Sequence, residues 1–152
     1  MSEAQPLIGI VIGHGALADG LVDAVRQITG VGADVLIPLS NRGLAPEAVA
    51  EEAERAAAGR PAIIFTDMYG GSCTNAARRF ARSHPEVVVI GGVNLPMLLD
   101  FVLHRDLPPA DLLGRLLTRG SPTLCYAPEG LRPSTDAVDR TAKAPLQERG
   151  GA

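Results

Sequence analysis

Short aliphatic runs alternate with segments of helical periodicity along this chain, and no other sequence feature constrains its fold as strongly. The first aliphatic run covers residues 7–12, and apolar residues then recur at helical spacing from Leu17 to Ile28, with Gly30 as a stop signal. The later runs cover residues 35–39, 62–66 and 87–90, and the later helical segments cover residues 46–58, 72–83, 97–104 and 109–118. This pattern predicts four strands and five helices in alternation.

Strands that alternate with helices indicate a parallel sheet with helices on both faces. The first, third and fourth runs are almost continuously aliphatic, which is typical of strands buried on both faces. For 152 residues we expect a flavodoxin-like, three-layer α/β sandwich with strand order 2-1-3-4. Residues 123–127 are the candidate for a fifth, edge strand. In this topology the order reverses between the first and third strands, and ligands bind outside the carboxyl ends of the strands at that point.

The composition fits one globular domain with an aliphatic core. Hydrophobic residues make up 46% of the chain, charged residues 20% and aromatic residues 3%, which excludes global disorder. We expect a domain over residues 1–127 and a disordered tail over residues 128–152. The net charge of -3, with scattered basic residues, argues against a nucleic-acid-binding or anionic membrane surface. No apolar run is long enough to span a membrane, and the two cysteines make no disulfide framework, so a reduced, cytoplasmic setting is expected.

His14 follows the first aliphatic run and stands between Gly13 and Gly15. The absence of Cβ atoms on both sides leaves room for a large reagent or partner at the imidazole. Histidine has an unperturbed pKa close to neutrality, so its ring can exchange a proton or accept a phosphoryl group under cellular conditions. A functional histidine and an ordinary loop histidine are both compatible with this pattern alone.

Asp67 follows the third strand, which the expected strand order places beside the first. The two residues are therefore predicted to meet at the carboxyl edge of the sheet. A carboxylate that accepts a hydrogen bond from one ring nitrogen fixes the tautomer, leaves the other nitrogen as the nucleophile and stabilises positive charge on the ring. We interpret His14 and Asp67 as a catalytic pair.

Gly70, Gly71 and Ser72 lead into the third helix and predict an anion site. Glycines let backbone N–H groups converge, and the start of a helix adds partial positive charge. Ser72 is expected to cap that helix, to contact a phosphate oxygen, or to do both. Cys73 in the first helical turn is read as a packing residue. His84 and His104 are expected at the surface, and no group of residues has the sequence spacing of metal ligands.

Three motifs follow one another at characteristic spacing. They are GIVIGHG at residues 9–15, FTDMYGGS at residues 65–72 and GGVNLPML at residues 91–98. Together they resemble the mannose-type (mannose/fructose/sorbose) IIA domains of the bacterial phosphoenolpyruvate-dependent sugar phosphotransferase system. The resemblance extends over roughly residues 7–120, most of the chain.

The resemblance implies that His14 accepts a phosphoryl group from the histidine phosphocarrier protein and passes it to a IIB-type acceptor. It also implies that Asp67 orients His14, that Gly71 and Ser72 help to hold the phosphate, and that no nucleotide or other cofactor is needed. Some members of the family form homodimers, so a homodimer is expected. The walls of the site are then expected to be Gly15, Met68, Asn94, Leu95 and Pro96.

Two departures from the family pattern concern the surroundings of the site. Cys73 and Thr74 stand where the family often has proline and phenylalanine, and Tyr69 stands where tryptophan is frequent. These changes leave the proposed chemistry intact and put sugar specificity and the partner-facing surface in doubt.

Three other functions use a similar site. A flavin- or nucleotide-binding flavodoxin-like protein normally has a hydroxyl-rich loop after the first strand, whereas residues 13–16 read GHGA. Histidine phosphatases and mutases carry an arginine just before the histidine to clamp phosphate, and Gly13 stands there. A phosphorylation-dependent regulatory module without sugar transport shares the chemistry of the leading hypothesis. The sequence names neither the sugar nor the downstream acceptor.

Overall fold

Four parallel strands form the sheet of the computed structural model, which describes residues 5–121. The strands are β1 (Ile8–Gly13), β2 (Leu36–Ser40), β3 (Ala62–Thr66) and β4 (Val87–Gly91). Their order is β2-β1-β3-β4, which confirms the predicted 2-1-3-4 topology. The expected edge strand at residues 123–127 and the expected tail at residues 128–152 lie outside the described residues.

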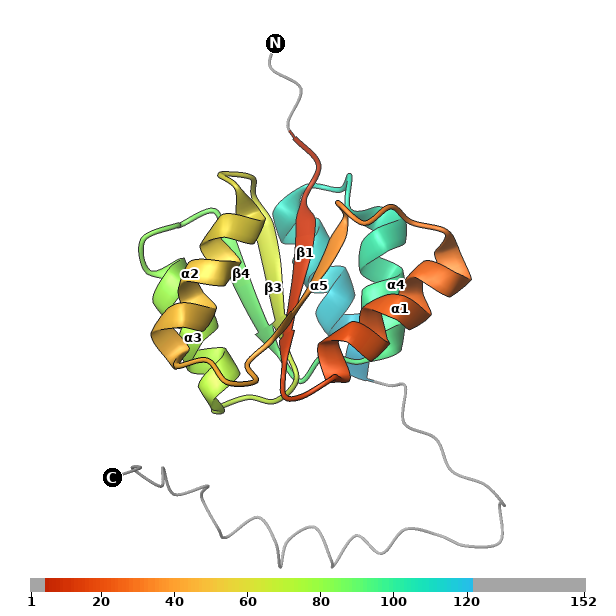
Figure 1. The fold of residues 1–152 in the computed structure, drawn as a ribbon. Coiled ribbons are helices and arrows are strands. Elements are labelled where there is room, and N and C mark those ends of the chain that lie inside the picture. The colour runs from red at the N-terminus through yellow and green to blue at the C-terminus, as the bar shows by residue number, and fades with distance from the viewer. Residues whose placement is uncertain (1–4, 122–152) are drawn as a thin grey trace, which may run out of the picture.

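Helices cover both faces of this sheet, as expected for a three-layer sandwich. Figure 1 shows α1, α4 and α5 on one side of the strands and α2 and α3 on the other. The helices are α1 (Leu17–Thr29), α2 (Pro46–Ala57), α3 (Ser72–Ala81), α4 (Leu95–His104) and α5 (Pro109–Gly120). Each layer buries its own hydrophobic cluster against the sheet, so the strands are apolar on both faces.

Successive side chains of β1 alternate between the two clusters. Val11 packs with the cluster under α1, α4 and α5, whereas Ile10 and Ile12 pack with the cluster under α2 and α3. Phe65 of β3 and Phe101 of α4 meet edge to face, with ring centroids 5.3 Å apart. The rest of this core is mostly aliphatic, as the low aromatic content predicts.

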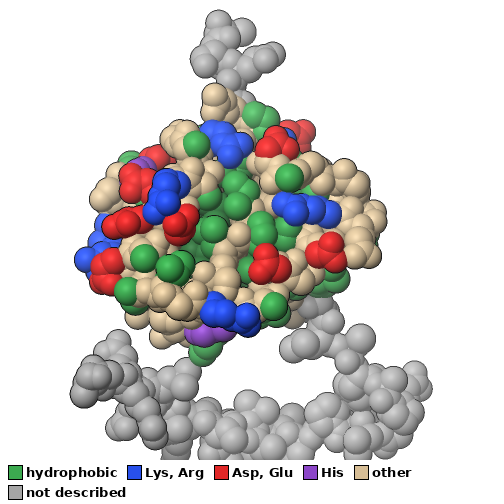
Figure 2. Space-filling view, viewed as in Figure 1, with side chains coloured by type: hydrophobic (Ala, Val, Ile, Leu, Met, Phe, Trp, Pro, Cys, Tyr) green, Lys and Arg blue, Asp and Glu red, His purple; other side chains and the backbone are tan. Residues whose placement is uncertain are grey.

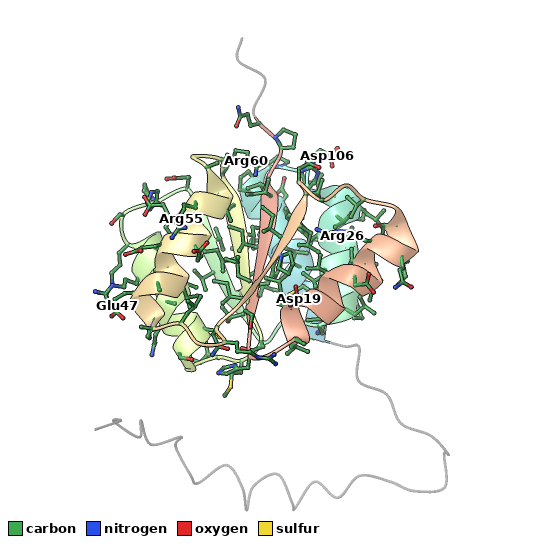
Figure 3. All side chains as sticks on the ribbon, in the orientation of Figure 1. Asp19, Arg26, Glu47, Arg55, Arg60 and Asp106 are labelled. Atoms are coloured by element: carbon green, nitrogen blue, oxygen red, sulfur yellow. The ribbon has the colours of Figure 1, made fainter. Side chains whose placement is uncertain are left out.

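Charged side chains lie outside the packed layers. Figure 3 shows Glu47 and Arg55 on the outer side of α2 and Asp106 at the edge where the strands begin, while hydrocarbon side chains fill the space between the layers. No helix within residues 5–121 is both long enough and apolar enough to cross a membrane.

Within residues 5–121, the predicted element boundaries lie within two residues of the observed ones. The start of α4 shows why small errors remain. The apolar pattern predicts a start at Met97, but Asn94 Oδ1 accepts a hydrogen bond from the N–H of Met97 at 3.0 Å and caps a helix that begins at Leu95. Likewise the pattern predicts that α2 extends to Ala58, but the helix ends at Ala57, because Ala58 adopts the left-handed conformation with φ of 50°.

Candidate active site

The carboxyl ends of β1 and β3 lie side by side at the lower edge of the sheet in Figure 1. In the parallel register Ile12 is opposite Thr66, and the N–H of Asp67 donates to the carbonyl of Ile12 at 3.3 Å. The residues that follow the two strands therefore leave the sheet next to each other. This arrangement brings His14 and Asp67 into direct contact, as the topology predicted.

The carboxylate of Asp67 holds both the backbone and the ring of His14. Its Oδ2 atom accepts hydrogen bonds from the His14 N–H at 2.9 Å and from His14 Nδ1 at 2.7 Å. Its Oδ1 atom accepts from the N–H of Met68 at 2.9 Å. Because a carboxylate accepts, Nδ1 carries the proton, and the lone pair of a neutral ring lies on Nε2. The His14 side chain is 49% exposed and that of Asp67 is 9% exposed, so a half-exposed ring is held by a largely buried carboxylate.

The same hydrogen bonds set the ionisation of Asp67. Burial alone would raise the pKa of the carboxyl, but the hydrogen bonds from the His14 side chain and backbone, the charge of the ring and the N–H of Met68 outweigh it. The pKa of Asp67 is therefore lowered from its ordinary value of 3.8. Asp67 is an anion at neutral pH and is available to stabilise positive charge on the imidazole.

The start of α3 lies on the Nε2 side of the ring. Ser72 Oγ is 3.5 Å from His14 Nε2, and a Cβ atom on Gly71 would lie 3.8 Å from His14 Cε1. Gly71 is the N-cap residue of α3, so Ser72 does not cap the helix and its hydroxyl is directed toward the ring. Gly70 reaches this position through a left-handed φ of 82°, which glycine adopts without steric cost. Together these residues place a hydroxyl and a helix N-terminus around the open nitrogen.

Two threonines fix the loop that carries Asp67. Thr74 Oγ1 donates to the carbonyl of Met68 at 2.6 Å and pairs with the buried Thr66 Oγ1 at 2.8 Å. These bonds hold the loop between β3 and α3 in place behind Asp67. Thr74 was distinctive in the sequence only as a departure from the family pattern, and the role of Thr66 was not predicted. The two threonines at the ends of residues 66–74 are the sequence feature that could have identified this support.

Cys73 lies beneath the imidazole, with its Sγ atom 3.7 Å from His14 Nδ1. The side chain is fully buried, and burial together with the charge of Asp67 raises the pKa of the thiol. Within residues 5–121, His14, Asp67 and Cys73 offer ligand atoms that all lie within 4.8 Å of one another. This proximity was not predicted from the sequence, because the three residues have no regular sequence spacing, and whether the site binds a metal stays untested. A metal ion would have to displace the bond between Nδ1 and Asp67 and deprotonate this thiol.

The end of β2 supports the other side of the His14 loop. Ser40 Oγ donates to the carbonyl of Gly15 at 2.7 Å and accepts from the N–H of Arg42 at 3.2 Å. The N–H of Asn41 donates to the carbonyl of Gly13 at 3.1 Å. A Cβ atom on Gly15, whose φ is 59°, would lie 3.4 Å from Nη2 of Arg42. Neither Ser40 nor Arg42 was predicted as a site residue, although β2 was expected to lie beside β1.

The segment after β4 lies against the end of β3. The N–H groups of Gly92 and Val93 both donate to the carbonyl of Thr66 at 3.0 Å. Asn94 donates from Nδ2 to the carbonyl of Gly120 at 2.9 Å as well as capping α4, whose first two residues are Leu95 and Pro96. The hydrogen bonds of the Asn94 side chain within the described chain thus hold α4 and α5 together. That these three residues wall the site stays a prediction.

Four large apolar side chains are exposed on the segments around His14. We call this set the apolar rim, and it consists of Leu17, Leu44, Met68 and Tyr69. Leu17 begins α1 directly after the His14 loop, Leu44 follows β2, and Met68 and Tyr69 belong to the loop after β3. Tyr69 is 75% exposed, although an aromatic ring is costly to leave in water. Exposed apolar side chains that gather on the segments around one site are typical of a docking surface.

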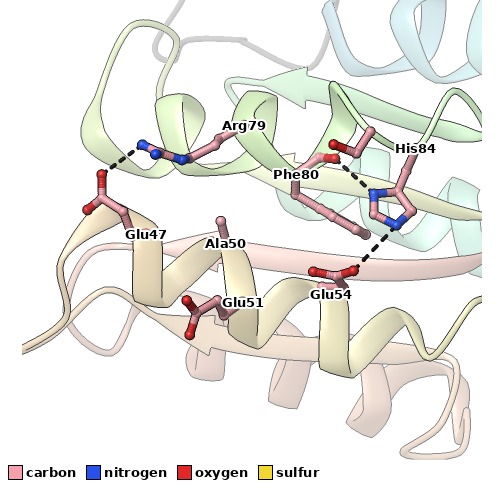
Figure 4. Close-up of a pocket in the computed structure, with 8 residues that line it drawn as sticks. Glu47, Ala50, Glu51, Glu54, Arg79, Phe80 and His84 are labelled. Atoms are coloured by element: carbon pink, nitrogen blue, oxygen red, sulfur yellow. Dashed lines mark hydrogen bonds and ion pairs between the residues drawn. The ribbon is translucent and has the colours of Figure 1, made fainter.

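The other two histidines are more tightly held than expected. Figure 4 shows His84 in a groove between α2 and α3, where its ring bonds to the carbonyl of Phe80 at 3.0 Å and approaches Glu54 at 3.6 Å. His104 bonds to the carbonyl of Asp100 at 2.9 Å. Both side chains are only about one-third exposed, at 27% and 33%. Neither lies at the carboxyl edge of the sheet, so neither competes with His14.

The model of a protein family described as "PTS system fructose IIA component" matches residues 9–112 of this chain. The mannose-specific EIIAB component of the phosphotransferase system (PTS) of Escherichia coli strain K12 is 32% identical over 108 residues, which are 68% of this chain and 33% of that protein. The sorbose-specific EIIA component of Klebsiella pneumoniae is 33% identical over 106 residues, covering 67% of this chain and 77% of that protein. The chain thus spans about one-third of the length of its mannose-specific relative.

A solved structure has the same fold. The crystal structure of phosphotransferase system component EIIA from Streptococcus agalactiae superposes with a TM-score of 0.73 at 21% sequence identity. The superposition covers 79% of this chain and 96% of that structure. Its architecture matches the three-layer sandwich described above.

Proposed function

Because this chain belongs to the family of PTS system fructose IIA components, we propose that it is a cytoplasmic phosphoryl carrier that accepts the group on His14. The observation that carries the proposal is the fixed imidazole: Nδ1 bonds to Asp67 at 2.7 Å, while Nε2 faces outward toward Ser72. A ring held in this tautomer presents one nucleophilic nitrogen in a defined direction.

The transfer step needs no other reagent than a phosphohistidine donor. The lone pair of His14 Nε2 forms the new phosphorus–nitrogen bond as the bond in the donor breaks and its electron pair returns to the donor imidazole. The proton on Nδ1 stays in its hydrogen bond with Asp67, whose negative charge offsets the positive charge that develops on the ring. Passing the group to the next acceptor repeats the same exchange in the opposite sense.

The surroundings of Nε2 suit the transferred group. The hydroxyl of Ser72 and the backbone N–H groups at the start of α3 provide donors and partial positive charge for phosphoryl oxygens. Gly71 brings the backbone close to the ring, since a Cβ atom there would lie 3.8 Å from His14 Cε1, and Gly70 makes the turn before it with a left-handed φ of 82°. We assign these three residues to phosphate binding and Gly15 and Met68 to the walls.

The apolar rim supports a protein as the donor. A small phosphorylated metabolite would be recognised by polar groups in an enclosed pocket, whereas a half-exposed histidine with exposed apolar side chains on the neighbouring segments suits a second protein surface. Figure 2 shows an apolar side chain next to the histidine at the lower edge of the molecule. We therefore propose the histidine phosphocarrier protein as donor and a IIB-type domain, or a regulatory partner, as acceptor.

The test is phosphorylation from phosphoenolpyruvate in the presence of the general enzyme and the phosphocarrier protein. We expect an acid-labile, alkali-stable phosphoprotein, as a phosphohistidine gives, and complete loss of label in His14→Ala. The variants His84→Gln and His104→Gln are matched controls and should label like the wild type. Label that persists in His14→Ala, or a wild-type chain that takes up no label, would overturn the proposal.

A further inference from the structure

We propose that Arg42 is a phosphate-binding residue of the His14 site and contacts the phosphoryl group during transfer, an inference that rests on the proposed function. Arg42 follows β2, the strand that pairs with β1 on the side away from β3. Its Nη2 atom lies 3.4 Å from the position that a Cβ atom would occupy on Gly15, the residue directly after His14. The guanidinium group therefore reaches over the His14 loop.

The backbone at Arg42 is tied to that loop at two points. Ser40 Oγ bridges the two segments, since it donates to the carbonyl of Gly15 and accepts from the N–H of Arg42. One residue earlier, the N–H of Asn41 donates to the carbonyl of Gly13. The backbone from which the Arg42 side chain extends is thus fixed relative to the His14 loop. Because Gly15 has no side chain, the space beside the ring stays open to the guanidinium group.

The charge of Arg42 is not used elsewhere in the described part of the chain. Arg79 pairs with Glu47 and Arg115 pairs with Asp100, but the Arg42 guanidinium has no hydrogen-bond or ion-pair partner within residues 5–121. An unpaired guanidinium group next to a nucleophile is available to an incoming anion.

The negative charge of the phosphoryl group favours a positively charged side chain close to His14. A phosphoryl group brings about two negative charges, and the anionic Asp67 lies close by on the ring of His14. Ser72 and the start of α3 offer only dipoles and partial charge against this repulsion. Arg42 supplies a full positive charge and several N–H donors from the β2 side. Histidine phosphatases and mutases carry a phosphate-clamping arginine just before the histidine. Gly13 stands at that position here, and the fold brings an arginine from the end of a neighbouring strand instead.

The experiment compares Arg42→Gln and Arg42→Lys with the matched control Arg55→Gln, whose exposed arginine lies on α2 and pairs with Glu52. Each variant is phosphorylated by two donors. One is the phosphorylated phosphocarrier protein. The other is phosphoramidate, a small molecule that transfers its phosphoryl group to the imidazole and releases ammonia.

We expect Arg42→Gln to slow phosphorylation of His14 by about a hundredfold with both donors, the lower end of the range for removing one donor that stabilises developing negative charge. Arg42→Lys should recover part of the rate, and Arg55→Gln should match the wild type. Loss with the protein donor alone would mean that Arg42 docks the partner, and no loss with either donor would mean that it has no role. Both results overturn the proposal. If the wild-type chain takes no label from the phosphocarrier, the proposed function fails, while the phosphoramidate rates still decide the role of Arg42.

Discussion

At the scale of single residues, Asp67 does more than orient a ring. One carboxylate accepts three hydrogen bonds, two from His14 and one from Met68, so it fixes the backbone corner and the imidazole together. The contact itself was predictable from the expected strand order. The backbone bonds were not, since they depend on how the chain turns after Gly13.

Replacing Asp67 with asparagine separates the role of its charge from that of its shape. Asp67→Asn should fold, because the amide is nearly isosteric, but it should slow phosphoryl transfer by roughly two orders of magnitude, since a neutral group cannot stabilise the imidazolium charge. The rate of phosphoryl transfer is measured by mixing each variant with the phosphorylated phosphocarrier protein and stopping the reaction at successive times. Asp106→Asn, at the opposite end of the molecule in Figure 3, is the control. Transfer at the wild-type rate would make Asp67 a purely structural residue.

The lowered pKa of Asp67 also predicts how stability depends on pH. Above the ordinary value of 3.8 the carboxyl is ionised in both the folded and the unfolded chain, and its full stabilising contribution is present. As pH falls below 3.8 the unfolded chain binds the proton first, so this contribution is lost as pH passes through the lower folded pKa. The difference in the free energy of unfolding between the wild type and Asp67→Asn should therefore shrink in acid. Urea titrations at pH values on both sides of 3.8 measure it, and a constant difference would contradict this explanation.

At the scale of elements, the strands were predictable because burial on both faces leaves an unmistakable aliphatic run, as in Ile8–Gly13 and Ala62–Thr66. The helix ends were less predictable, since they depend on single contacts. The helix α4 begins two residues before the predicted start, because the side chain of Asn94 accepts a hydrogen bond from the N–H of Met97. Gly71 takes the N-cap position of α3 and leaves Ser72 to the site.

Close contact between elements makes Gly9 in β1 hard to replace. A Cβ atom there would lie 2.5 Å from Leu36 Cδ1 and 2.8 Å from Phe101 Cε1, and both of these side chains are fully buried. Gly9→Ala should lower the free energy of unfolding by about 1–3 kcal/mol, the usual cost of overpacking a core. Gly114→Ala is the matched control: its Cβ would meet no atom within 4 Å in α5, so alanine should stabilise the helix by about 0.5–1 kcal/mol. Urea unfolding of both variants measures the two values. An unchanged free energy of unfolding in Gly9→Ala would show that β1 has room for a Cβ atom at this position.

At the scale of the whole molecule, the strand order decides which residues share the site. The order 2-1-3-4 was predicted, and it brought the segment after β3 to His14 as expected. The same order also places the end of β2 there, which is how Ser40 and Arg42 reach the loop. Ser40 and Arg42 belong to none of the three sequence motifs, so only their position in the fold identifies them as residues of the site. The proximity of Cys73 to His14 has the same origin.

The sheet also bears on assembly. Within residues 5–121, β2 and β4 each pair with one neighbour, so each leaves an edge of the sheet that proteins usually cover. Residues 123–127, which lie outside the described residues, are the apolar segment that we predict to cover such an edge, in the same chain or in a second copy. With the homodimers implied by the resemblance, this predicts a dimer that depends on that segment.

Two truncations test the dimer. A chain that ends after Ser121 keeps all of α5, including the Gly120 carbonyl that accepts from Asn94, but lacks residues 123–127. A chain that ends after Gly130 keeps the segment and lacks only the expected tail. We expect the shorter chain to dissociate at concentrations where the longer one stays dimeric, because only the shorter one leaves the sheet edge without its cover. Light scattering across a dilution series measures the mass of each. A monomeric full-length chain, or a shorter chain that dimerises as strongly as the longer one, would exclude this segment from the interface.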